Sequence, residues 1–105
     1  MSVTYIIRFR VAAEQAERFL ALLGEVLDAM RHEPNFHEAI LHRDPDDAQR
    51  FMLYETWADH DDVLNVQIHK PYRAQGHAAL PELLAEPRDI SIWQSTRADR
   101  RSDGI

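Results

Sequence analysis

The spacing of apolar residues changes several times along the chain, and each change marks an expected element. Residues 3–11 alternate strictly, which predicts a strand. Its apolar face carries Val3, Tyr5, Ile7, Phe9 and Val11. From Glu14 to about Arg31 the apolar positions recur at the i, i+3, i+4, i+7 spacing of an amphipathic helix. Pro34 cannot continue that helix, so we expect it to end there.

Two more strands are expected at 36–43 and 50–57, because both stretches are rich in apolar and β-branched or aromatic residues. The turn-forming residues Asp44, Pro45, Asp46 and Asp47 lie between them. We therefore expect a hairpin with a long polar loop.

The second half begins with Asp59, which we expect to cap a helix that carries Val63, Leu64 and Ile68 on one side. Pro71 suits the first turn of a further helix that runs to about Ala79, and Pro81 should interrupt the pattern. Residues 89–95 alternate again and predict a fourth strand.

The expected order is β-α-β-β-α-β, which predicts an α+β fold of the ferredoxin-like type. In this fold an antiparallel sheet carries its helices on one face. We expect a single domain over residues 1–105, with a core at about 2–95 and a polar tail at 98–105. Strand 50–57 is also apolar on its second face, at Met52 and Tyr54. That face needs cover, so we expect a homodimer that pairs sheet against sheet.

Composition narrows the function classes. The formal charge of -6 and the absence of a basic cluster argue against a nucleic-acid partner. The chain has no cysteine, which excludes disulfides and thiolate chemistry. We find no signal peptide and no apolar run long enough for a membrane span, so we expect a cytoplasmic protein with no membrane partner.

Glu55 is the most informative residue, because alternation places it on the same face as Phe51, Leu53 and Trp57. A carboxylate in an apolar layer must be paired, hydrogen-bonded or protonated. One interpretation is a structural pair with Arg8 or Arg73. The other is a pocket acid or proton acceptor whose pKa is raised.

Among the histidines, His69 stands near the end of the helix that follows Glu55's strand. It could interact with the helix dipole, or it could act as a general base. His37 and His42 lie on opposite faces of a strand and cannot share a metal. With no HxxxH or HxH arrangement, we expect no metal site.

One family combines these features. The pattern F-x-L-Y-E-x-W, followed by an acid-rich helix and H-K-P-Y, resembles the antibiotic biosynthesis monooxygenase family. The matching residues are Phe51, Leu53, Tyr54, Glu55, Trp57, His69, Pro71 and Tyr72. The resemblance extends over about residues 2–95.

This resemblance implies a dimeric α+β barrel with a pocket in each subunit. It also implies oxygenation of a small aromatic substrate, such as a quinol or phenol, by O₂ with no cofactor. By the same resemblance His69 would be the base or orienting group and Glu55 its acid partner. The implied substrate-binding residues are Trp57, Tyr54, Tyr72, His37 and His77.

Three alternatives stay open. The protein could bind a small molecule or serve as a stress-related dimer without turnover, or it could isomerise a small signalling molecule. A haem-degrading monooxygenase of the same superfamily is a poorer match. The first strand lacks that branch's asparagine, and Val66 stands about where its tryptophan would be. Only His77 lies near the position of the haem ligand.

Overall fold

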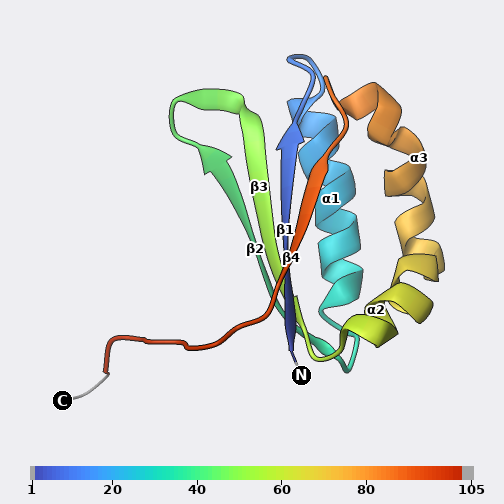
Figure 1. Cartoon of the computed structure of the whole chain (residues 1–105). Coiled ribbons are helices and arrows are strands. Elements are labelled where there is room, and N and C mark those ends of the chain that lie inside the picture. Colours follow the sequence, from blue (N-terminus) through green and yellow to red (C-terminus); the bar gives the residue numbers. More distant parts are fainter. Residues whose placement is uncertain (1, 103–105) are drawn as a thin grey trace.

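A computed structural model describes residues 2–102, and it has the expected α+β architecture (Figure 1). Its elements are β1 (Val3–Arg10), α1 (Ala16–Met30), β2 (Phe36–Asp44), β3 (Asp47–Trp57), α2 (His60–Asn65), α3 (Ala74–Leu83) and β4 (Asp89–Trp93). Two 3₁₀ turns, Gln67–His69 and Pro71–Arg73, link α2 to α3. The strands form one antiparallel sheet in the order β2-β3-β1-β4. The helices cover one face of it, as Figure 1 shows, so the ferredoxin-like prediction is confirmed.

The core lies between that sheet face and the helices, because alternation sends the apolar residues of β1 and β3 to the same side. Phe19 of α1 lies against Phe9 and Phe51, with ring centroids 5.0 Å and 5.1 Å away. A second cluster surrounds Trp57, which is fully buried. It contains Val3, Tyr5, Met30 and Val63. These two clusters hold the sheet and helices at a fixed separation.

Three local expectations were wrong. The β2–β3 hairpin is tight rather than long, because Asp44 pairs with Asp47 and leaves only two residues in the turn. The helix capped by Asp59 ends at Asn65, before it can carry Ile68. Pro81 lies inside α3, which continues to Leu83. Proline removes only its own N–H bond to the preceding turn, and the turn that follows Pro81 still closes through a hydrogen bond of 3.0 Å from Leu84 N to Leu80 O.

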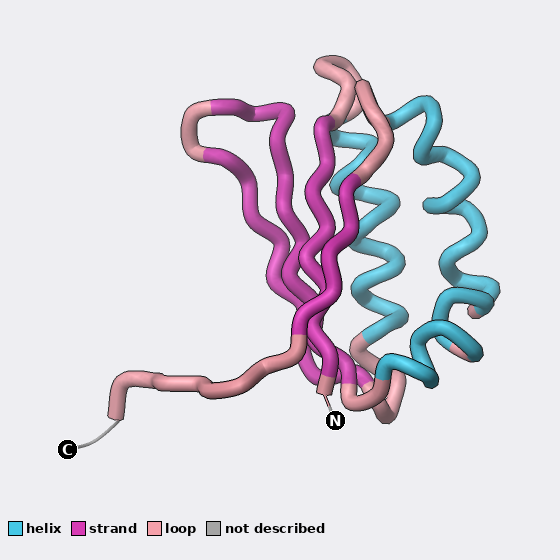
Figure 2. The backbone as a smooth tube through the Cα atoms, viewed as in Figure 1, coloured by secondary structure: helices cyan, strands magenta, loops and turns pink. Residues whose placement is uncertain are grey.

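The second sheet face has no helix over it (Figure 2). It carries Ile40 and Trp93, which are 46 % and 56 % exposed, and the half-buried Met52 and Tyr54. The tail after β4 leaves the body of the molecule as an extended segment. Residues 103–105 of the expected tail lie outside the described residues. Within residues 2–102, no helix has the length and apolar character needed to cross a membrane.

Phe19 offers a test of this packing. Phe19→Ala should lower the free energy of unfolding by about 3–5 kcal/mol, because it opens a cavity between two aromatic rings. Urea denaturation followed by circular dichroism measures the change. Leu20→Ala is the matched control, since Leu20 is the next residue of α1 and is 36 % exposed; its cost should be about 1 kcal/mol or less. Equal costs at both positions would contradict the packing described above.

Candidate functional site

A cavity of about 80 Å³ lies between α1, α3 and the helix-covered face of the sheet. Its walls are largely apolar and come from β1, β3, α1 and α3; they include Ile7, Leu23, Val26, Leu53 and Leu80. Four polar residues line it as well: Glu55, Arg73, His77 and Arg88. A mostly apolar cavity with a few convergent polar groups is the usual form of a small-molecule site.

Glu55 reaches this cavity from the middle of β3 and is 6 % exposed. The indole Nε1 of Trp57 donates a long hydrogen bond, 3.4 Å, to its Oε1. None of the ion pairs among residues 2–102 includes Glu55. Burial therefore raises the pKa of Glu55, against the opposing effects of Arg73, the Trp57 hydrogen bond and Arg88.

Of the two structural partners considered for Glu55, Arg8 is excluded by its position. Arg8 lies on the other face of the sheet, where its Nη1 is 3.4 Å from Asp89 Oδ2. Successive residues of a strand point to opposite faces, and Arg8 stands next to Ile7 and Phe9, which line the cavity. Arg73 does share the cavity, close enough to influence the ionisation of Glu55.

Arg73 enters the cavity from the 3₁₀ turn that starts at Pro71. Its guanidinium carbon lies 5.8 Å from the ring centroid of Trp57 and 5.4 Å from that of Tyr72, within cation–π distance of both rings. Its Nε and Nη2 atoms are buried, and neither has a hydrogen-bond partner in the described part of the chain. The turn thus brings a positive charge into an apolar cavity and leaves part of it unsatisfied.

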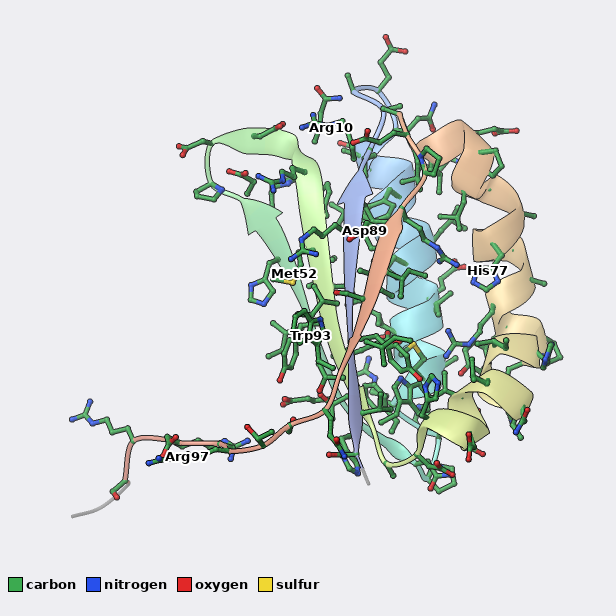
Figure 3. The ribbon with its side chains drawn as sticks, viewed as in Figure 1. Arg10, Met52, His77, Asp89, Trp93 and Arg97 are labelled. Carbon is green, nitrogen blue, oxygen red and sulfur yellow. The ribbon has the colours of Figure 1, made fainter. Side chains whose placement is uncertain are left out.

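His77 follows Arg73 by four residues, so the two side chains lie on the same side of the chain as α3 begins. His77 projects from α3 (Figure 3) and lines the cavity between α3 and the sheet. His77 is exposed overall, but its partial burial lowers its pKa, and the charges of Arg88 and Arg73 lower it further. A neutral imidazole at neutral pH can accept a proton.

Arg88 completes the polar lining from the segment just before β4. Burial lowers the pKa of Arg88, and Glu55 counteracts that shift. A guanidinium keeps its charge in proteins, so Arg88 adds a second positive charge to the cavity. Sequence reasoning missed Arg88, because a single arginine in a loop between Pro87 and a strand carries no periodic signal.

The structure does not bring His69 into this cavity. His69 is exposed and ends the first 3₁₀ turn. The inward position of that turn belongs to Gln67, which is 3 % exposed and hydrogen-bonds to Asp62 and Tyr72. Because α2 stops at Asn65, the turn is rotated relative to the continuous helix that we expected. The placement of His69 and Glu55 as neighbours across a pocket wall is therefore wrong.

The other predicted binding residues also separate into groups. Tyr54 lies on the sheet face opposite the cavity, and it lines a shallow polar depression there together with His37 and the tail. Tyr72 is adjacent to Arg73 and contacts its guanidinium, and burial raises the pKa of the Tyr72 hydroxyl. Trp57 is buried beside Glu55 and holds that carboxyl. Of the predicted site residues, the cavity lining contains Glu55 and His77.

Chemically, the cavity combines a buried carboxyl, a neutral histidine and two cations. This set can take a proton from a ligand and stabilise the negative oxygen that results. No group of three His, Cys, Asp or Glu side chains able to hold a metal ion occurs among residues 2–102.

Glu55→Gln tests the state of the buried carboxyl. The pKa of Glu55 is raised above 4.5 in the folded protein. Between pH 4.5 and that folded pKa, Glu55 therefore keeps its proton more often in the folded state than in the unfolded state. The free energy of unfolding should therefore fall as pH rises from about 4.5 to the folded pKa. Gln cannot ionise, so the variant should be more stable than wild type at pH 7 and similar to it at pH 4.

Urea denaturation across this pH range measures the effect, and Glu38→Gln on the exposed part of β2 is the matched control. If Glu55→Gln were less stable than wild type at neutral pH, the ionised carboxylate would be the favoured form, contrary to this account.

Comparison with known proteins shows which family the chain belongs to. Residues 2–77 match the family model described as antibiotic biosynthesis monooxygenase. A protein of Pestalotiopsis microspora named "Putative monooxygenase GME11364" is 35 % identical over 95 residues, which cover 88 % of this chain and 78 % of that protein. The family match ends at His77, so it includes Glu55, Arg73 and His77 of the cavity lining but not Arg88.

Solved structures share the fold. An antibiotic biosynthesis monooxygenase structure from Nitrosomonas europaea, itself named as putative, has a TM-score of 0.84 and 20 % identity, over 90 % of each chain. SnoaB of Streptomyces nogalater, described as a cofactor-independent oxygenase, has a TM-score of 0.78 and 19 % identity, over 99 % of this chain and 98 % of that one. The matched residues and the 35 % identical relative show that this chain belongs to the antibiotic biosynthesis monooxygenase family.

Proposed function

We propose that this protein is a cofactor-independent monooxygenase that oxidises a small aromatic quinol or phenol with O₂. The observation that carries the proposal is the presence of Glu55 and His77 together in one largely apolar cavity. Membership of a monooxygenase family supports the reaction class. A quinol is the substrate class that suits such a site, since it needs only to lose a proton before it can reduce O₂.

The reaction balances without a further reductant. An ionised phenol transfers one electron to O₂, and the resulting radical and superoxide combine to form a C–O bond. Loss of water from the peroxide then leaves a quinone: one oxygen atom stays in the product, and the other leaves in water. For a phenol with a free ring position, phenol plus O₂ gives quinone plus water.

The side chains of the cavity would supply the protein's part in this reaction. His77, whose pKa is lowered, would accept the hydroxyl proton. Arg88 would stabilise the phenolate that remains. The apolar walls would exclude water from the radical intermediates. The first proton transfer is thereby moved from His69, where we had expected it, to His77.

The geometry does not favour the haem-degrading alternative. The cavity of about 80 Å³ is well below the roughly 300–1,000 Å³ of typical ligand pockets. A single aromatic ring is closer to its size than a porphyrin, although His77 does line it.

We also propose that two chains associate through the sheet face that has no helix. Ile40, Met52, Tyr54 and Trp93 give this face an apolar character that water alone would not favour. The predicted binding residues His37 and Tyr54 lie on this side and would then belong to the interface. Their role would then be in subunit pairing rather than in ligand binding.

The reaction is tested by oxygen consumption. Chelator-treated protein should consume O₂ with a panel of hydroquinones and naphthols at a rate above their autoxidation. With ¹⁸O₂, mass spectrometry should find one labelled oxygen atom in the quinone product. His77→Ala should lower the rate by about 100-fold or more, as expected for loss of a general base.

His69→Ala is the matched control, because it removes an exposed histidine that does not line the cavity; its rate should equal that of wild type. A large loss in His69→Ala with none in His77→Ala would return the role to His69. Ligand binding without O₂ consumption would instead favour the binding-protein alternative, and rearrangement without O₂ the isomerase.

Association is tested by light scattering coupled to size exclusion. The wild type should be a dimer at micromolar concentration, and Ile40→Asp should shift it toward monomer by placing a charge on the apolar face. Leu64→Asp is a close control, because Leu64 on α2 is also 46 % exposed but lies away from the sheet. A monomeric wild type would contradict the pairing.

A further inference from the structure

The unsatisfied atoms of Arg73 are the strongest feature that the proposed chemistry does not account for. Nε and Nη2 are both buried, and neither has a hydrogen-bond partner among residues 2–102. Nearly all buried polar atoms in folded proteins are hydrogen-bonded, so two orphans on one side chain require an explanation. The two atoms also lie on the same edge of the guanidinium, and their N–H bonds point the same way.

The balance of charges in the cavity also indicates a missing anionic partner. Arg73 and Arg88 bring two positive charges, while Glu55 is the single acidic side chain of the lining. Burial raises the pKa of Glu55, which weakens its ability to balance them. Glu33, an acid whose charge reaches the neighbouring Tyr72, already interacts with Lys70 at 3.6 Å and with Gln67 at 3.4 Å. The cavity is thus short of negative charge.

Building on the proposed function, we propose that the substrate is an aromatic acid: a hydroxylated ring with a carboxylate that binds to the free edge of Arg73. Parallel N–H groups on one guanidinium edge fit the two oxygens of a carboxylate. The rings of Trp57 and Tyr72 lie 5.8 Å and 5.4 Å from the guanidinium carbon, within cation–π distance of the group. Arg88 adds a second positive charge to the same cavity.

This arrangement would orient the ring as well as bind it. With the carboxylate on Arg73, the ring lies among the apolar residues of β1, β3 and α1, and its hydroxyl can reach the groups that handle protons. A quinol without the carboxylate would leave the buried Arg73 edge unpaired. A site that leaves a polar group unpaired discriminates strongly against the ligand lacking the matching group.

The test uses three single-ring probes, chosen because the cavity is small. Gentisate is hydroquinone with a carboxylate, and methyl gentisate masks that charge with little change in shape. Isothermal titration calorimetry under argon measures binding without turnover. Gentisate should bind at least tenfold more tightly than methyl gentisate or hydroquinone to the wild-type protein, a comparison that needs no variant. Equal affinities, or no binding of gentisate, would overturn the proposal.

Variants then identify the residue responsible. Arg73→Gln should abolish the preference for gentisate. Arg73→Lys should keep only part of it, because an ammonium has the charge but cannot donate two parallel hydrogen bonds to a carboxylate. Arg18→Gln is the matched control: Arg18 is an exposed arginine of α1 paired with Glu82, outside the cavity. Unchanged gentisate affinity in Arg73→Gln would overturn the assignment to Arg73.

The outcomes separate this inference from the proposed function. Tight gentisate binding without O₂ consumption in air would keep the carboxylate site and remove the oxygenase. Consumption of O₂ with hydroquinone at the same affinity and rate as with gentisate would keep the oxygenase and remove the carboxylate site.

Discussion

The burial of one carboxyl group determines how the rest of the site is arranged. Glu55 lies in the middle of an apolar sheet face, where an isolated negative charge would be costly. Trp57 donates one long hydrogen bond to Glu55. Arg73 and Arg88 line the same cavity and favour the ionised carboxylate, but neither forms an ion pair with it. The charges in the cavity are therefore only partly balanced, and a bound ligand can complete that balance.

The two faces of the sheet have different surroundings. On one face α1 and α3 cover the strands, and a cavity lined by Glu55, Arg73 and His77 lies between them and the sheet. The other face has no such cover and carries Ile40 and Trp93 at its surface. The strict alternation of β3 explains this difference, because successive side chains of the strand point to opposite faces of the sheet.

Sequence reasoning succeeded where periodicity is strong. The alternation of β1 and β3 and the spacing of α1 predicted the fold, and the same alternation correctly grouped Glu55 with Phe51, Leu53 and Trp57, which are buried with it. The motif that includes Glu55 and Trp57 also indicated the family. These signals are local and repeat over many residues, so small errors at the ends of elements do not change them.

The chain between β3 and β4 was harder to predict. The end of α2 at Asn65 turns Gln67 inward and His69 outward, and a shift of this kind depends on a few backbone angles that composition does not reveal. Arg73 was predicted only as a structural partner, and Arg88 was not predicted at all. Both reach the cavity from turns or loops, where a residue's direction follows from tertiary packing and not from a repeating pattern.

The state of the Glu55 carboxyl is the central claim, and carbon-13 NMR titration measures it directly. With the side-chain carboxyls labelled and the Glu55 signal identified by its loss in Glu55→Gln, the free protein should show a Glu55 pKa above 4.5. Saturation with gentisate should raise this pKa further, because a second negative charge would then lie nearby. A Glu55 pKa below 4.5 in the free protein would show a carboxylate fully compensated by the arginines, and would contradict this account.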